Sequence, residues 1–358
     1  MRPPALPCPA LLVLVACTAP LLPVALRAAD KESADRAAGK LITPAAERAI
    51  ERGLAFLASR QHEDGSLGTS AYGKNVAVVS LCGMAMMSAG STPGRGPYGA
   101  EVDKCLDFIL RNTQESGYIK SPIDPSDRPM YGHGFATMFL AECYGMAQRP
   151  ELRGKLGKAV ELIANCQNEQ GGWRYRPLRE DAADVSVTVC QVMALRAARN
   201  AGIYVPPEKI ERAIDYIKKC QNPDGGFKYI LIPVGESASA FPRSAAAVVG
   251  LYCAGIKELD EGPEVANGLK YLMQYLPQRG VERRDAYYFY GHYYAVLAMW
   301  QAGGEPWARW YPAIRDDLVS RQQPAGSWVD LSISNEFATA MACLILGVPN
   351  NYLPIFQR

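Results

Sequence analysis

Apolar residues recur along this chain in paired segments, and the two members of each pair differ in polarity. The first member is amphipathic, with apolar residues at i, i+4 and i+7, as in Ile50–Leu57 and Ile210–Ile217. The second is small and apolar around its whole circumference, as in Val76–Ala89 and Val187–Ala201. The first spacing predicts a helix with one solvated face, and the second predicts an enclosed helix.

Six such pairs follow one another, each separated by a glycine-containing turn. The amphipathic segments are Ile50–Leu57, Val102–Ile109, Leu156–Ile163, Ile210–Ile217, Val265–Leu272 and Tyr311–Leu318. The enclosed segments are Val76–Ala89, Phe135–Met146, Val187–Ala201, Ser244–Ala254, Tyr294–Ala302 and Phe337–Leu346. The turn glycines are Gly65, Gly117, Gly171, Gly225, Gly280 and Gly326. A period of about fifty residues identifies a repeat protein.

The turns carry a motif of the form Gln-x-x-x-Gly-x-aromatic. It is clearest in Gln167–Trp173, Gln221–Phe227 and Gln322–Trp328, and a degenerate copy runs through Gln61–Leu67. We expect the glutamine amide to donate to the last carbonyls of the amphipathic helix. The glycine supplies a positive φ that ends the helix, and the aromatic ring packs the turn against the neighbouring hairpin.

Six hairpins with solvated and enclosed helices can stack as an open superhelix or close into a double ring. The count of six favours the ring. The predicted fold is therefore all-α, an (α/α)6 toroid with an inner and an outer ring of helices. We expect the loops before the enclosed helices to gather at one mouth of the inner ring.

The amino-terminal segment predicts export. A basic start at Arg2 followed by the apolar run 10–26 is typical of a signal peptide, expected to span residues 1–29. The alternative is a lipoprotein signal, because Leu14–Cys17 matches a lipoprotein processing box, and a lipid anchor would then associate the protein with a membrane. The expected location is the periplasm or the extracellular space. Residues 30–45 form the expected linker, and residues 46–358 form the toroid with an ordered carboxy-terminal tail.

Charge argues against nucleic acid as a partner. The formal net charge is +2, and removal of residues 1–29 deletes two arginines and no acid, which leaves about zero. No basic stripe remains for phosphate contacts.

Eight cysteines lie within the predicted helices, where they are expected to be buried thiols, with one or more disulfides as the alternative. The oligomeric state is left open.

The repeated motif resembles the Gln-Trp repeat of squalene and oxidosqualene cyclases. Over about residues 45–347 the chain is similar to the prenyltransferase and squalene cyclase repeat superfamily. The resemblance implies an α/α toroid whose inner helices surround an apolar cavity, and thus an apolar or isoprenoid-like ligand.

The acid motif of these cyclases, Asp-x-Asp-Asp at the start of an inner helix, is incomplete here. Its nearest match is Asp181-Ala-Ala-Asp184, in which Ala183 replaces the central acid. Asp181 and Asp184 match only the flanking positions. Asp184 is either a functional carboxylate or the amino-terminal cap of the following helix.

The zinc site of the related prenyltransferases is also incomplete. The stretch Asp285–His292 resembles its later part, but the only Asp-x-Cys, Asp103–Cys105, falls on an outer helix. The resemblance and the absence of a glycine-rich phosphate loop predict no metal and no cofactor.

Other residues that can take part in chemistry lie at the starts of the enclosed helices. The clearest example is the tripeptide Tyr-Gly-His, which occurs at 131–133 and again at 290–292. The candidate catalytic residues are Asp181, Asp184, His292 and Glu336. The candidate ligand-binding residues are Tyr131, His133, Arg243, Tyr287, Tyr288 and Tyr290. This set suits general acid and base work or ligand binding, since aromatic walls stabilise a carbocation or stack on a sugar.

Three functions fit these observations. The leading one is an exported toroid that binds an apolar or isoprenoid-like ligand, with terpene cyclase-type activity that the missing central acid leaves open. The second is a carbohydrate-active enzyme on the same ring, with Asp184 and Glu336 as its carboxyls. The third is a noncatalytic interaction scaffold, expected if Met84, Met138, Met193 and Met341 fill the inner ring.

Overall fold

The computed structural model describes residues 41–69, 72–231, 237–255, 262–278 and 287–357. These belong to one compact unit, Leu41–Arg358. The predicted signal segment 1–29, most of the linker and the turn glycine Gly280 lie outside the described residues. None of the helices described is long and apolar enough to span a bilayer.

Helices of two kinds alternate along the described chain, as the polarity pattern predicts. The outer helices are α2 (Pro44–Arg60), α4 (Gly99–Arg111), α6 (Leu152–Cys166), α8 (Pro207–Lys219), α10 (Pro263–Leu272) and α12 (Gly304–Arg321). The inner helices are α3 (Val76–Met87), α5 (Pro129–Cys143), α7 (Val185–Asn200), α9 (Phe241–Cys253), α11 (Tyr288–Ala302) and α13 (Asn335–Gly347). Short 3-10 turns are η2 (Met273–Tyr275), η3 (Val348–Asn350) and η4 (Pro354–Phe356).

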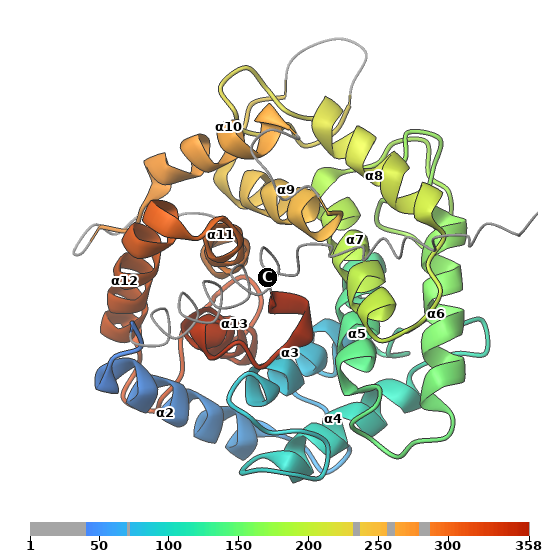
Figure 1. Cartoon of the computed structure of the whole chain (residues 1–358). Helices are drawn as coiled ribbons and strands as arrows, with labels where there is room; N and C mark the ends of the chain where they lie inside the picture. Colours follow the sequence, from blue (N-terminus) through green and yellow to red (C-terminus); the bar gives the residue numbers. More distant parts are fainter. Residues whose placement is uncertain (1–40, 70–71, 232–236, 256–261, 279–286, 358) are drawn as a thin grey trace, which may run out of the picture. The chain divides into compact units, whose positions relative to one another are not determined.

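The inner helices form a closed ring. Each packs on the next in the order α3, α5, α7, α9, α11, α13, and α13 packs back on α3. Figure 1 shows the outer helices arranged around them. Inner helices are buried on nearly every side because they carry almost no charge, whereas α8 buries only one face, at Ile210, Ala213, Tyr216 and Ile217. The predicted (α/α)6 toroid is therefore confirmed.

All inner helices begin at the same end of the ring, which we call the amino-terminal mouth. Backbone hydrogen bonds there join neighbouring repeats: Met130 N–H donates to the Tyr175 carbonyl at 3.0 Å, and Val185 N–H to the Tyr229 carbonyl at 3.1 Å. Several inner helices start earlier than predicted; α5 begins at Pro129 instead of Phe135. In α5 and α9 a proline in the first turn explains this, because its fixed φ is already helical and its missing N–H is not needed there.

Each turn motif fastens one repeat to the next, and we call it a clasp. The described clasp glycines have positive φ, for example 94° at Gly171. The Gln167 amide donates to the Gly171 carbonyl and to the Lys209 carbonyl at the start of α8, both at 2.8 Å. A Cβ on Gly171 would lie 2.4 Å from the Arg212 carbonyl oxygen, so only glycine lets the turn approach α8 this closely.

The predicted hydrogen bond from the glutamine to the end of its own helix is wrong. The Trp173 indole N–H makes that contact instead, donating to the Ile163 carbonyl at 2.7 Å. Trp328 does the same to Leu318 at 2.8 Å. The glutamine amide crosses to the neighbouring hairpin in the clasps without an indole as well, at Gln61 and Gln221.

The last clasp closes the ring. The Gln322 amide donates to the Ala49 carbonyl in α2 at 2.8 Å, in the way the other clasps contact the outer helix that follows them. Residues 270 positions apart thereby meet, since Gln322 Oε1 also accepts from the Arg52 guanidinium at 3.1 Å. A linear superhelix would leave this glutamine without a neighbour.

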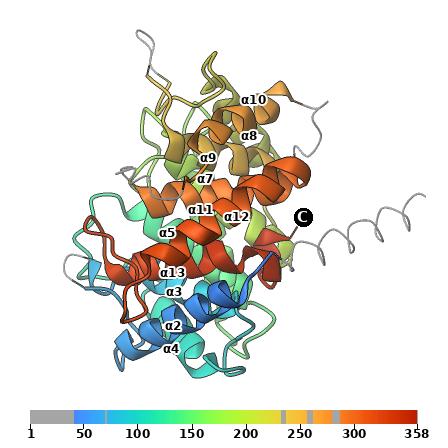
Figure 2. The ribbon, with the colours of Figure 1, turned by 90° about the vertical axis from the view of Figure 1, so that its left-hand side faces the viewer.

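The carboxy-terminal tail packs on the opposite end of the ring, the carboxy-terminal mouth. Figures 1 and 2 show this red segment at one end of the inner helices. The Phe356 carbonyl accepts from the Trp300 indole at 2.9 Å, and Leu353, Ile355 and Phe356 are buried. The tail is held because its apolar side chains would otherwise be exposed.

The eight cysteines in the described residues are free thiols, and all but Cys253 are buried. They behave as small apolar residues of the helices. The four methionines of the scaffold hypothesis, Met84, Met138, Met193 and Met341, are buried as well. Their burial fits tight packing between inner helices.

We predict that Gln167→Ala lowers the free energy of unfolding by about 2 kcal/mol, because it removes one hydrogen bond within the turn and one to the next repeat. Gln323→Ala, at an exposed glutamine one position after a clasp glutamine, should change it by less than about 0.5 kcal/mol. Denaturant titrations of both variants measure the difference. Equal effects would show that the clasp amide contributes nothing specific.

Candidate functional site

Asp184 is a buried carboxyl at the amino-terminal mouth. It is the cap of α7, and its Oδ1 accepts from the Val187 N–H at 2.8 Å. Its backbone is fixed by a bridge to Trp173, so the third clasp sets its position. The side chain is 0% exposed, and Oδ2 has no hydrogen-bond partner among the described residues. Both interpretations of Asp184 therefore stay open, since one oxygen caps the helix and the other is unused.

The environment of Asp184 favours its protonated form. Burial raises the pKa from 3.8 to about 6, while the Val187 N–H and the nearby guanidinium groups of Arg174 and Arg128 oppose this. Desolvation outweighs these contacts because the carboxylate is removed from water. A carboxyl of this kind holds a proton in mildly acidic solution.

Several tyrosines lie near this carboxyl. Tyr131 on α5 and Tyr290 on α11 lie close enough to Asp184 for its charge to raise both of their pKa values, after the larger effect of burial. Because α5 and α11 are not neighbours in the ring, these side chains reach across its interior. The Tyr290 hydroxyl is buried with the side chains of Ser186 and Tyr294 as its hydrogen-bonding neighbours. Tyr131 and Tyr290 are thus two predicted site residues that the structure brings to Asp184.

Two further tyrosines complete the mouth and are absent from the sequence prediction. The hydroxyls of Tyr175 and Tyr229 hydrogen-bond to each other, and Asp184 raises the pKa of Tyr229 after burial does. The Tyr131 and Tyr175 rings are 6.4 Å apart. Both added tyrosines lie four residues after a clasp glycine. This repeated position was the signal that could have identified them.

Arginines lie beside this aromatic cluster. The guanidinium carbons of Arg128 and Arg174 are 4.8 and 5.3 Å from the centre of the Tyr175 ring. Arg243, the arginine predicted from sequence, instead holds the backbone before α9: its Nε donates to the Phe227 carbonyl at 2.9 Å. Its guanidinium still lies 6.0 Å from the Tyr229 ring.

His133 is part of a clasp. Its Nδ1 accepts from the Ile119 N–H at 3.2 Å, and its Nε2 lies 3.3 Å from the Ala159 carbonyl. In three other repeats the corresponding backbone N–H donates to a side-chain hydroxyl instead, that of Thr188, Ser244 or Thr339. Burial lowers the pKa of His133 to about 4, so the ring is neutral. Its two nitrogens are engaged in the fold, which separates it from the Asp184 cluster.

His292 occupies the corresponding place on α11 and packs among aromatic rings. Its ring centre is 4.5 Å from that of Tyr288, 5.0 Å from Phe241 and 5.9 Å from Trp310. The Tyr288 hydroxyl donates to Asp317 on α12. These two candidates therefore face the outer helix α12. Tyr287 precedes α11 with a positive φ of 64° and is 59% exposed.

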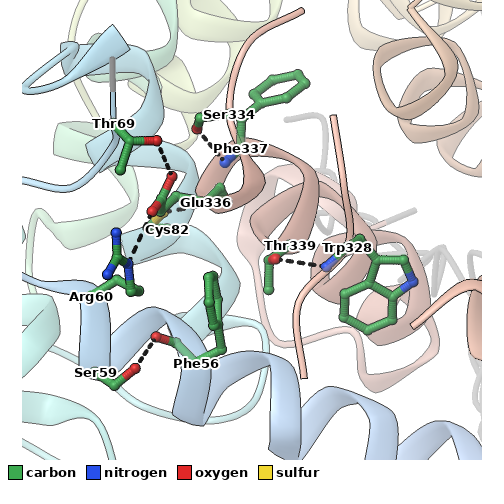
Figure 3. A network of polar contacts seen from close by, with 10 residues as sticks. All are labelled: Phe56, Ser59, Arg60, Thr69, Cys82, Trp328, Ser334, Glu336, Phe337 and Thr339. Carbon is green, nitrogen blue, oxygen red and sulfur yellow. Dashed lines mark hydrogen bonds and ion pairs between the residues drawn. The ribbon is translucent and has the colours of Figure 1, made fainter. Parts of the chain in front are cut away.

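Glu336 is held at the side of α2. Figure 3 shows its carboxylate between Arg60 and Thr69, with Oε1 3.3 Å from the Arg60 Nε and Oε2 3.3 Å from the Thr69 hydroxyl. It is 2% exposed and lies in the first turn of α13, three places around the inner ring from α7. The structure does not bring Glu336 to Asp184.

The position of the absent central acid is tightly packed. Ala183 is buried, and its carbonyl accepts from the Tyr216 hydroxyl at 2.7 Å. A Cβ on Gly172 would lie 2.6 Å from the Ala183 Cβ, which shows how little space surrounds this methyl group. Asp181 lies on the exposed loop before it. Of the acid-motif positions, only Asp184 lies close enough to the tyrosine cluster to raise the pKa values of its members.

In the part of the chain that the structure describes, no three histidine, cysteine, aspartate or glutamate side chains are grouped to hold a metal ion. Asp285, from the incomplete zinc motif, lies outside the described residues.

Comparison with known proteins agrees with this architecture. Residues 98–284 match the model of the prenyltransferase alpha-alpha toroid domain. A drimenyl diphosphate synthase from Streptantibioticus cattleyicolor is 28% identical over 197 residues, covering 54% of this chain and 34% of that protein. The chain spans about a third of the length of the curated relatives it matches.

Two solved structures share the fold. The type II terpene cyclase MstE from Scytonema has a TM-score of 0.61 at 14% identity, covering 86% of this chain and 99% of that one. A variant of that cyclase was solved with its substrate geranylgeranyl dihydroxybenzoate. An inactive variant of the α-1,6-mannanase GH76A of Salegentibacter sp. HEL1_6 has a TM-score of 0.63 at 9% identity, covering 88% and 99%.

These likenesses at low identity show the fold, and the matched model covers half of the chain. With the clasps, the two rings and the family match in agreement, this chain belongs to the prenyltransferase α/α toroid family.

Proposed function

We propose that this protein is a terpene cyclase-type enzyme in which Asp184 protonates an alkene of an isoprenoid ligand. One observation carries the proposal: a fully buried carboxyl opens an inner helix with an unused oxygen among tyrosine rings. The cyclase relatives support the reaction class, and the structure of MstE with an isoprenoid substrate supports the ligand class.

The chemistry follows from the protonated form of Asp184. Its Oδ2–H gives the proton to one alkene carbon, the carboxylate remains, and the other alkene carbon becomes cationic. The electron pair of a second alkene then attacks this cation and closes a ring. Loss of a proton from a neighbouring carbon forms a new alkene and balances the reaction as an isomerisation. The faces of Tyr131 and Tyr290 stabilise the positive charge.

Asp184 takes the role that the family assigns to a central acid. Capping of α7 uses Oδ1 of Asp184 and leaves Oδ2 available. Burial keeps the carboxyl protonated at mildly acidic pH. Arg128 and Arg174 lie at the same mouth and oppose this shift. They suit the approach of an anionic head group, since arginine binds phosphate well.

The carbohydrate hypothesis rests on the mannanase fold likeness. A glycosidase of the usual kind needs two carboxyls on either side of the scissile bond. Its second predicted carboxyl, Glu336, is paired with Arg60 at the α2 side. We therefore retain sugars as rival substrates in the test below.

We predict that the purified protein converts farnesyl or geranylgeranyl diphosphate, or squalene, into a product of unchanged mass. Asp184→Asn keeps a capping side chain but cannot donate the proton, so its rate should fall at least about 100-fold. Asp181→Asn, at the exposed acid three residues earlier, should stay within about twofold. Mass spectrometry with chromatographic separation of isomers measures both.

Conversion by Asp184→Asn at the wild-type rate would contradict the assigned acid. Hydrolysis of α-1,6-mannotriose with no isomerised terpenoid would replace the cyclase proposal by the carbohydrate one.

We predict a second, substrate-independent effect of Asp184. A folded-state pKa of about 6 against 3.8 means that the folded protein keeps a proton that the unfolded chain loses. The stabilisation is full below about pH 4 and is lost as pH rises through about 6. Relative to Asp184→Asn, wild type should therefore lose on the order of 2 kcal/mol of unfolding free energy between pH 4 and pH 7. Chemical denaturation at several pH values measures the difference, and parallel curves would refute the buried titration.

A further inference from the structure

Two buried polar side chains on inner helices, one near the end of α5 and one in the first half of α11, each have an oxygen without a hydrogen-bond partner. Glu142, near the end of α5, is 3% exposed, and Tyr293 on α11 is 0% exposed. Glu142 Oε2 and the Tyr293 hydroxyl make no hydrogen bond to any described residue. The proposed proton transfer at Asp184 uses neither of them.

The carboxy-terminal tail brings these two groups to one place. The Ile355 N–H hydrogen-bonds to the Glu142 carboxyl, and the Tyr293 ring centre is 6.1 Å from that of Phe356, the next residue. The Glu142 charge is one of the influences that raise the pKa of Tyr293, after burial. The turn η4, which packs on α7, therefore forms a floor beside both polar groups.

The floor itself is well fixed. Both the Trp300 indole and the Gln301 amide donate to the Phe356 carbonyl, at 2.9 and 3.3 Å. With the Ile355 N–H also engaged, the backbone polar groups of the tail leave Glu142 Oε2 unused. A movement of η4 that gave Glu142 Oε2 a partner would therefore break hydrogen bonds that the tail already makes.

Unpartnered polar atoms at this depth are costly, at about 1 to 3 kcal/mol each. Two together need ordered water or a polar group of a ligand. A phenylalanine at position 293 would fill the same space without burying an unpartnered hydroxyl. The pair is therefore best explained by a partner that the protein receives from outside.

The charge at this end defines the chemical class of that partner. Burial raises the pKa of Glu142 to about 8, so the carboxyl is mostly neutral at pH 7, and Tyr293 is neutral too. No lysine or arginine is among the groups that shift either pKa. The two hydroxyl donors fit an uncharged oxygen, whereas an anion would find no cation here.

Aromatic rings connect this end with the Asp184 cluster. Ring centres are 4.8 Å apart for Tyr290 and Tyr294, 5.0 Å for Tyr294 and Tyr293, and 6.1 Å for Tyr293 and Phe356. Of these tyrosines, Tyr293 has a hydroxyl without a hydrogen-bond partner among the described residues. These rings therefore form a continuous aromatic connection between Asp184 and Glu142.

We propose that Glu142 and Tyr293 form a polar subsite at the tail end of the ring interior, which binds a hydroxyl or carbonyl oxygen of an isoprenoid compound. This inference rests on the proposed function for the isoprenoid class of the ligand. It adds a preference: an oxygenated isoprenoid binds better than a hydrocarbon of the same length.

The preference is measured with farnesol and β-farnesene, which differ mainly in one hydroxyl, by titration of the intrinsic tryptophan fluorescence. Trp300 contacts the tail that forms the floor of the subsite. We expect wild type to bind farnesol at least about tenfold more tightly, since an unpaired polar site rejects a ligand that lacks the hydroxyl. Tyr293→Phe and Glu142→Leu should each bring the ratio of the two affinities close to one, with the β-farnesene affinity within about twofold of wild type.

Two controls accompany these variants. Glu142→Gln keeps an uncharged hydrogen-bonding side chain and should preserve most of the preference. Tyr204→Phe removes a hydroxyl from an exposed ring and should preserve all of it. Tyr293→Phe deletes a single oxygen, so it tests the proposal even if Glu142→Leu fails to fold.

Equal binding of the two probes to wild type, no binding of either, or an unchanged preference in Tyr293→Phe would overturn the subsite. So would a crystal soaked with farnesol that shows only water between Glu142 and Tyr293. Because binding is measured without turnover, a protein that prefers farnesol yet forms no isomer keeps the subsite and loses the proposed cyclase activity. A protein that forms an isomer but does not prefer farnesol keeps the proposed cyclase activity and loses the subsite.

Discussion

A glutamine amide that joins two neighbouring hairpins is the contact on which the rest of this molecule depends. In the clasp at Gln167 it binds the glycine carbonyl of its own turn and the first-turn carbonyl of the next outer helix. The positive-φ glycine lets the turn approach that helix. The same contact between Gln322 and Ala49 joins the last hairpin to the first, so a local motif determines a closed ring.

Closure of the ring brings polar side chains from different inner helices together. Their starts meet at one mouth, where Asp184 is positioned by the clasp residue Trp173 and lies near tyrosines from α5 and α11. Their ends meet at the other mouth, where the tail packs against Trp300. The unpartnered oxygens of the interior lie between these ends, which connects the proposed acid with the proposed subsite for an uncharged oxygen.

The fold could be predicted from the sequence because the clasp repeats and the two helix types differ in polarity. The site could be predicted only in part. Asp184, Tyr131 and Tyr290 meet as neighbours, while His133 and Glu336 bind backbone or side-chain groups of the fold. Residue type and position at a helix start do not reveal which neighbour a side chain faces. Glu142 was missed because its partner site is built from the tail, which is distant in sequence.

A crystal structure of the Asp184→Asn protein with a bound isoprenoid diphosphate tests the central claim most directly, because this variant should bind without turning over. The account predicts an extended ligand along the rings of Tyr290, Tyr294 and Tyr293, with an alkene carbon in contact with residue 184 and the diphosphate near Arg128 and Arg174. An interior closed by packed side chains, with the ligand absent or bound on the outer surface, would contradict it.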